Sequence, residues 1–218
     1  MSPRDLRRAS DQRFLSVAAS LTAAEWAAPS LCDGWTCHEV LAHLVTGCSL
    51  PLPDFGVALA RHRGGFHAAN TWLARELAAR RPPAALLSDY AERSRNPRGL
   101  GRAFPSRLLV GDHVIHELDI LLAIGRQPRI PAETLHAVLR TEVTVPNPFV
   151  PARAIAAGFR LRATDTGWTW GDRSPANLHV HGTAADLASV LAGRPRALPR
   201  LDGSGVPQLA ARLTARGR

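Results

Sequence analysis

Residues 105–123 read PSRLLVGDHVIHELDILLA, a segment that is apolar on nearly every side of a helix. Such a helix is expected to be buried, and buried helices rarely carry ionisable groups that lack partners. The segment nevertheless contains Asp112, His113, His116 and Glu117 near its centre. These polar side chains therefore need partners from another part of the chain.

The four polar residues form two pairs with helical spacing. Asp112 and His116 are four residues apart, so they lie one above the other on a helix. His113 and Glu117 form a second such pair, about 100° further round. Imidazole nitrogens and carboxylate oxygens are ordinary ligands of zinc and its neighbours. Asp112 with His116 is the preferred metal-ligand pair, and His113 with Glu117 is the rival pair.

The stretch WTCHEVLAH, residues 35–43, supplies a third candidate ligand. Thr36 and Glu39 have the spacing of a capping box, which fixes where the helix begins and which way its faces point. In this phase His43 lies on or beside the apolar face. Three protein ligands leave coordination positions open, which is typical of a catalytic metal. The ordinary alternative is a set of hydrogen-bonded or solvated histidines without any metal.

The first two-thirds of the chain is predicted to be helical. The connecting segments are expected to be LTAAEWAAPS, a short connector, and NPRGLGR, a loop. Apolar periodicity and helix-end signals predict helices over residues 4–20, from Thr36 onward, over 55–80 with an interruption near Gly64–Gly65, and over 82–95, 105–123 and 132–141.

The pattern changes after residue 145. Residues 145–152 contain three prolines and are expected to form a linker. Residues 158–172 alternate with period two, which predicts strands around the turn TDTG, and NLHVHG predicts a third strand. Two further helices are expected, at 183–193 and 206–216. These patterns predict a helical domain, residues 1–145, and a small α+β domain, residues 146–218.

The net charge of +9 raises the possibility of nucleic-acid binding. The chain contains no lysine, its arginines are scattered, and no known nucleic-acid-binding motif occurs.

Three cysteines do not suit a disulfide framework, and the polar N-terminal sequence lacks an apolar signal core. No apolar run reaches the ~18 residues of a membrane span. We therefore expect a cytoplasmic protein without a membrane partner, for which nucleic acid is an unfavoured partner.

Several of these stretches resemble one family. LCDGWTCHEVLAHLVTG and VGDHVIHELDILLAIGRQPRIP are similar to the metal-binding helices of the mycothiol-dependent maleylpyruvate isomerase family, and LRATDTGWTWGD, HGTAADLASVLAGR and LDGSGVPQL are similar to its C-terminal domain. The resemblance covers most of the chain and is weakest over residues 50–100. It implies a DinB-like four-helix bundle followed by a small α+β domain that resembles sterol-carrier proteins.

The resemblance also implies a site and a chemistry. The metal ligands, through which catalysis would occur, fall on His43, Asp112 and His116, and Asp112 stands where the family usually has glutamate. Apart from the resemblance, Asp119 and His113 are expected to support these ligands as hydrogen-bonding partners, and a structural role near the helix end is the alternative for Asp119. The cofactors would be a divalent metal, zinc first, and mycothiol, whose thiolate would attack a small electrophilic substrate in an isomerase or thiol transferase reaction.

Two other functions stay open at this stage: a non-catalytic protein that binds a small ligand or partner in the same fold, and a basic protein associated with nucleic acid. A cysteine nucleophile has no nearby His–Asn arrangement to support it, so Cys32, Cys37 and Cys48 are expected to be packing residues. Core packing is likewise expected for Trp168 and Trp170. Arginines of the second domain are weak candidates for binding a substrate carboxylate: Arg160, Arg162, Arg200 and Arg212.

Overall fold

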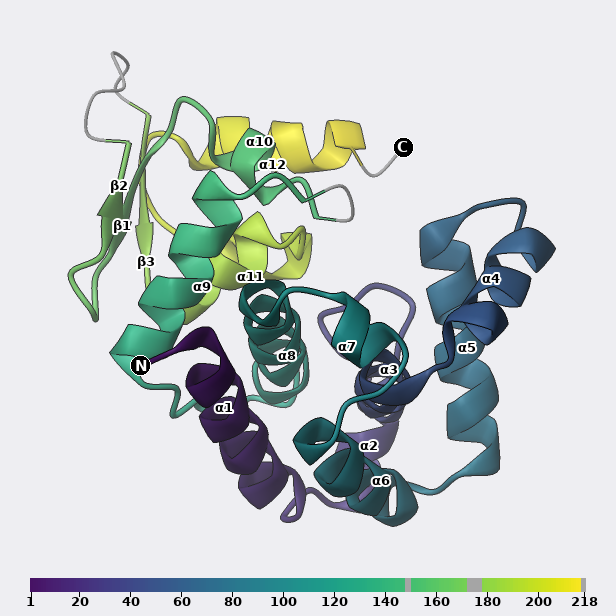
Figure 1. The fold of residues 1–218 in the computed structure, drawn as a ribbon. Helices are drawn as coiled ribbons and strands as arrows, with labels where there is room; N and C mark the ends of the chain where they lie inside the picture. The colour runs from purple at the N-terminus through teal and green to yellow at the C-terminus, as the bar shows by residue number, and fades with distance from the viewer. Residues whose placement is uncertain (148–149, 172–177, 217–218) are drawn as a thin grey trace. The chain divides into compact units, whose positions relative to one another are not determined.

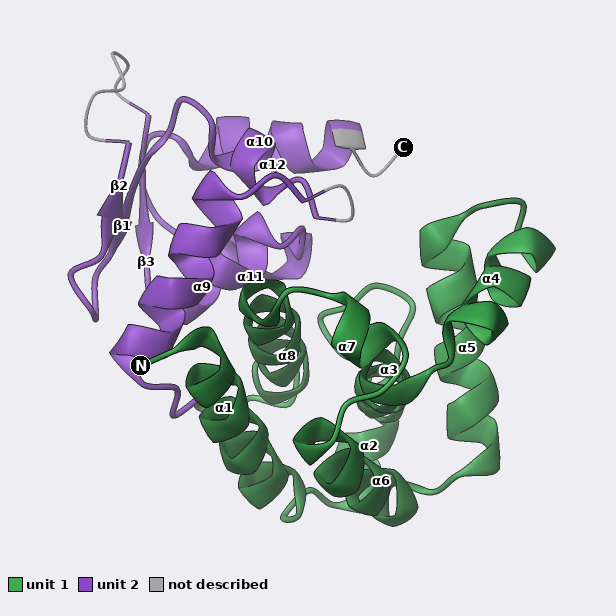
Figure 2. Ribbon diagram, in the orientation of Figure 1, with its two compact units in different colours: residues 1–127 green, residues 128–218 purple. Residues whose placement is uncertain are grey.

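The computed structural model describes residues 1–147, 150–171 and 178–216. The chain divides into two compact units, Met1–Gln127 and Pro128–Arg218 (Figure 2). The division lies before the helix α9 (Ala132–Thr144), whereas the sequence-based boundary follows this helix. Helix α9 packs against α11 (Ala184–Leu191) and α10 (Ala152–Ala156), so its apolar face completes the core of the second unit.

Unit 1 is helical, as the sequence predicts. Its long helices α1, α3, α6 and α8 pack in a ring, α1 on α8, α8 on α3, α3 on α6 and α6 on α1, which makes a four-helix bundle (Figure 1). Helix α5 packs on the outside of α3, and α4 packs on α5. The bounds of these helices are α1 Pro3–Ala18, α2 Ala23–Ala27, α3 Cys37–Ser49, α4 Leu52–Arg61, α5 Phe66–Arg80, α6 Pro83–Arg95, α7 Leu100–Ala103 and α8 Ser106–Leu121.

Capping boxes determine where several helices begin. The Thr36 hydroxyl accepts a hydrogen bond from the Glu39 backbone N–H, and the Glu39 carboxylate accepts one from Thr36, which confirms the predicted start of α3. Thr22 and Glu25 make the same pair at the start of α2. This box explains why a short helix forms in LTAAEWAAPS, where the sequence analysis expects only a connector.

Helix α7 is the second element that the sequence analysis misses, because it expects NPRGLGR to be a loop. The backbone of this segment approaches the C-terminal end of α3 closely. A Cβ atom at Gly99 would lie 1.9 Å from the carbonyl oxygen of Leu50, and one at Gly101 would lie 2.6 Å from that of Cys48. Only glycine therefore fits at these two positions.

Unit 2 is the predicted small α+β part. Its sheet has the order β2–β1–β3, with β1 antiparallel to β2 and parallel to β3. Leu161, Ala163 and Val180 are buried, and α11 packs on the sheet. The elements are α9 and α10, β1 Arg160–Ala163, β2 Thr169–Trp170, β3 His179–Gly182, α11, the 3-10 helix η1 Pro195–Arg200 and α12 Val206–Arg216.

Some sequence predictions fall partly outside the described residues. The expected linker at 145–152 includes residues 148–149, which are not described, and it ends where α10 begins. The third predicted strand begins at residue 177, also not described, and β3 starts at His179. Within the described residues, no helix combines the length and the apolar character that crossing a membrane requires.

Candidate functional site

Three side chains from α3 and α8 converge inside unit 1: His43, Asp112 and His116. The Asp112 Oδ1 atom lies 3.8 Å from His43 Nε2 and 3.6 Å from His116 Nε2. One possible ligand atom from each residue lies within 4.8 Å of the other two. The two rings meet edge to face, with centroids 4.7 Å apart. Two imidazole nitrogens and one carboxylate oxygen thus point at a common space.

The chemical states of these groups suit a cation. Partial desolvation opposes ionisation of Asp112, but the adjacent His43 and His116 imidazoles outweigh it and hold the pKa of the carboxyl below its ordinary value. Burial lowers the pKa of His116, which keeps its ring neutral at neutral pH. The site therefore offers an ionised carboxylate beside an imidazole that can act as a ligand.

Asp119 fixes the orientation of His116. The His116 Nδ1 atom donates a hydrogen bond of 2.9 Å to Asp119 Oδ2, and the Asp119 side chain is fully buried. With the proton held at Nδ1, the lone pair of Nε2 faces Asp112 and His43. Asp119 is expected from the sequence to support a metal ligand, and the structure places it in contact with His116.

The opening of the site lies on the Asp112 side. The Asp112 side chain is 40% exposed, whereas those of His43 and His116 are 13% and 9% exposed. A small molecule can therefore approach the carboxylate side of the cluster, while the two imidazoles are held in the bundle. This asymmetry suits a centre with protein ligands on one side and an open position on the other.

Trp35 forms an apolar wall beside both imidazoles. Its ring stacks on His116 at 6.2 Å and 16°, and it contacts His43 at 5.2 Å. Its indole N–H donates to Thr71, which locks the ring. Trp35 is not among the site residues predicted from the sequence. Its place directly before the cap, on the side of His43, is the signal that was available.

The turn before α3 holds Trp35 in position. Gly34 has a φ of +73°, a left-handed conformation that favours glycine, and its carbonyl accepts a hydrogen bond from Arg75. The Leu31 backbone N–H donates to the carbonyl oxygen of Asp119, 2.9 Å away. The segment that begins α3 is thus joined to the end of α8, which brings the two ligand-bearing helices together.

The rival pair, His113 and Glu117, lies on a different side of α8. His113 contacts Asp11 and Tyr90, and Glu117 accepts two hydrogen bonds from Arg13. Both residues thus face α1, and His113 also meets α6, because they lie about 100° round the helix from Asp112 and His116. His113 is expected from the sequence to support a metal ligand, yet the contacts seen here join it to Asp11 and Tyr90.

The cysteines have the packing character that the sequence analysis expects. Cys37 and Cys48 are buried in the core of unit 1, and Cys32 is partly buried. Burial, with a smaller contribution from Asp119, raises the pKa of Cys37 to about 11, so the thiolate is scarce at neutral pH. This chemistry does not favour a nucleophilic role for Cys37.

Arg212 and Arg200, two of the arginine candidates, contact other residues of unit 2. One Arg212 nitrogen donates to the carbonyl oxygens of Ala154, Ile155 and Ala157, which closes the C-terminal end of α10. Arg200 lies 3.7 Å from Asp186. Trp168 is buried, as core packing predicts, whereas Trp170 is 37% exposed.

Comparison with known proteins relates this chain to one family. Residues 7–106 match the family model described as "Mycothiol maleylpyruvate isomerase N-terminal domain", a range that includes His43 and ends before Asp112. The structure is similar to the crystal structure of the mycothiol-dependent maleylpyruvate isomerase, with a TM-score of 0.56, 18% identity and 88% of each chain covered. A point variant of that isomerase matches equally well. No curated protein matches the sequence.

At 18% identity the structural likeness establishes the fold, and the family model adds the relationship of the N-terminal part. The mostly helical chain with a small C-terminal sheet agrees with the two-part layout expected from the sequence. The resemblance of this chain to the mycothiol-dependent maleylpyruvate isomerase family is therefore confirmed.

Proposed function

We propose that this protein is a metal-dependent enzyme that uses mycothiol as its thiol cofactor, acting as an isomerase or thiol transferase on a small electrophilic substrate. The observation that carries the proposal is the convergence of His43, Asp112 and His116 from two helices. The family match and the fold of a solved mycothiol-dependent maleylpyruvate isomerase supply the chemical class.

In this proposal His43, Asp112 and His116 hold a divalent metal, with zinc as the first candidate because imidazole and carboxylate groups are ordinary zinc ligands and three protein ligands leave a position open. Bound there, such a metal would supply Lewis acidity and lower the pKa of a thiol in its open position. Asp119 keeps the His116 Nε2 lone pair directed at the site, and Trp35 keeps water from one side of both imidazoles.

Asp112 stands where the resemblance leads us to expect glutamate, and its shorter side chain raises the question of reach. Its Oδ1 atom nevertheless lies within 4 Å of both histidine Nε2 atoms. The low pKa of Asp112 also keeps it ionised, as a metal ligand must be. Both observations support Asp112 as a functional ligand in this chain.

Replacing Asp119 by asparagine is expected to weaken metal affinity by roughly 10- to 100-fold, because the buried carboxylate that fixes the His116 ring is lost. Competition with a fluorescent zinc chelator measures the affinity. Thermal unfolding of the metal-free variant serves as the control, since it reports any structural effect separately. Unchanged affinity would show that Asp119 does not position His116 for metal.

The proposed function is tested with protein purified without a histidine tag. Metal analysis is expected to find about one transition metal ion per chain. Mycothiol should then support turnover of maleylpyruvate or of another electrophile from a panel, and a chelator should abolish that turnover. A metal-loaded protein that is inactive across the panel would favour the non-catalytic binding function, and a protein without metal would contradict the proposal.

A further inference from the structure

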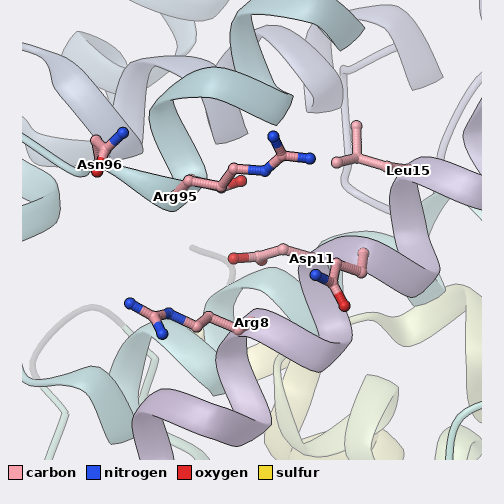
Figure 3. A pocket seen from close by; sticks show the side chains of 7 residues that line it. Arg8, Asp11, Leu15, Arg95 and Asn96 are labelled. Atoms are coloured by element: carbon pink, nitrogen blue, oxygen red, sulfur yellow. The ribbon is translucent and has the colours of Figure 1, made fainter.

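A cavity lies between α1 and the C-terminal end of α6, and none of the three proposed metal ligands of α3 and α8 lines it. It has a volume of about 310 Å³ and is open to solvent. Figure 3 shows the Asp11 side chain between those of Arg8 and Arg95. The cavity is lined by Arg8, Asp11, Gln12, Leu15, Ser94, Arg95 and Asn96.

The floor of this cavity is a buried carboxylate held in a fixed position. Asp11 is 3% exposed, and its Oδ1 atom accepts a hydrogen bond of 2.7 Å from the Tyr90 hydroxyl and contacts His113 Nδ1 at 2.5 Å. Its Oδ2 atom lies 3.3 Å from Arg7, which also donates to the carbonyl oxygen of Ser94. Among the described residues, Oδ2 thus accepts only one long hydrogen bond and keeps acceptor capacity.

The walls of the cavity carry an excess of positive charge. Arg8 and Arg95 are exposed, and neither makes a salt bridge with the described residues. Asp11 does not neutralise them, because Arg7 already pairs with its carboxylate. The side-chain amides of Gln12 and Asn96 add hydrogen-bond donors, and Leu15 adds an apolar surface.

We propose that this cavity binds a small hydroxy acid at a site separate from the metal centre. The carboxylate of the ligand would pair with the guanidinium groups of Arg8 and Arg95, which suit planar carboxylates. The ligand hydroxyl would donate to Asp11, whose position is fixed before binding. The cavity would therefore prefer a hydroxy acid to a simple carboxylic acid. Only a hydroxy acid has both a carboxylate for Arg8 and Arg95 and a hydroxyl that donates to Asp11.

Calorimetric titration of the full chain with malate, and with succinate as the matched acid without a hydroxyl, tests the proposal. The titrations use the His43→Ala variant, so that carboxylate binding to a metal cannot contribute. Malate is expected to bind more tightly than succinate by about tenfold, the effect of one hydrogen bond to a charged acceptor. Arg8→Ala and Arg95→Ala should each weaken malate binding by about tenfold.

Arg4→Ala is the matched control, because it removes the same charge from an exposed position on α1 outside the cavity. It should leave malate affinity within about twofold of the parent, as expected for screened charges. Equal weakening by Arg4→Ala and Arg8→Ala, equal affinity for malate and succinate, or no malate binding would each overturn the proposal. The test holds whether or not the metal-dependent activity is found, since the His43→Ala background removes a metal ligand.

Discussion

His43→Ala is expected to remove the bound metal and to lower metal-dependent turnover by more than about 100-fold, while the chain stays folded. His43 supplies one of the three converging ligand atoms, and without it only Asp112 and His116 of α8 remain. The structural cost should be small, because the contact of His43 with Asp112 is long, at 3.8 Å. Metal analysis and the mycothiol assay measure the two effects.

His116→Ala should have the same effect on metal and turnover. It also removes the hydrogen bond from His116 Nδ1 to the buried Asp119 carboxylate, and the loss of such a hydrogen bond to a charged group costs about 1–3 kcal/mol of folding stability. Unfolding must therefore be measured alongside for this variant. His43→Ala avoids the difficulty, and the two variants together separate loss of metal from loss of structure.

The matched control for both variants is His38→Ala. His38 lies on α3, like His43, and its ring contacts the carbonyl oxygen of Arg81 rather than the site. The His38→Ala variant should keep its metal and its activity. Retention of metal by both His43→Ala and His116→Ala would end the enzyme hypothesis in its present form, because the metal would then not be bound by the three converging residues.

Much of the fold and of the candidate site could be predicted from local sequence patterns. The Thr36–Glu39 capping box fixes the phase of α3, and phase alone puts His43 on the inner side of that helix. The four-residue spacing of Asp112 and His116 puts both on one side of α8. Periodicity and capping act over a few residues, so a sequence displays them directly.

Contacts between distant segments could not be predicted in the same way. His113 and Glu117 have the same spacing as the other pair, and only their partners on α1, Asp11 and Arg13, show a different role. The stacking of Trp35 on His116 likewise joins residues far apart in the chain. Such pairings depend on how helices pack, which helical spacing leaves open.

The ion pair between Arg13 and Glu117 provides the largest expected effect on stability. Glu117 has a side chain 1% exposed and accepts hydrogen bonds of 3.0 and 2.6 Å from Arg13 Nε and Nη2. Arg13→Met would leave a buried carboxylate unpaired, which costs about 3–5 kcal/mol. Chemical denaturation monitored by circular dichroism measures this loss in the free energy of unfolding.

The cost of Arg13→Met should also depend on pH in a definite direction. Burial raises the pKa of Glu117 in the folded protein, and Arg13 acts against that rise. Without Arg13 the pKa of Glu117 in the folded protein rises further above its value in the unfolded chain. At a pH between these two pKa values, the folded protein binds one proton more than the unfolded chain. Stability of the variant should therefore fall as pH rises through this window, and the destabilisation should be smallest in acid.

Arg80→Met is the matched control for Arg13→Met, because Arg80 pairs with Glu76 on the exposed face of α5. An exposed pair contributes at most about 1 kcal/mol, with little dependence on the protonation of a buried group. The double variant Arg13→Met with Glu117→Leu should recover most of the loss, since it removes the buried charge together with its partner. Equal destabilisation by Arg13→Met and Arg80→Met would mean that the Glu117 carboxylate is solvated in the folded protein. That result would contradict the buried position of Glu117 against α1.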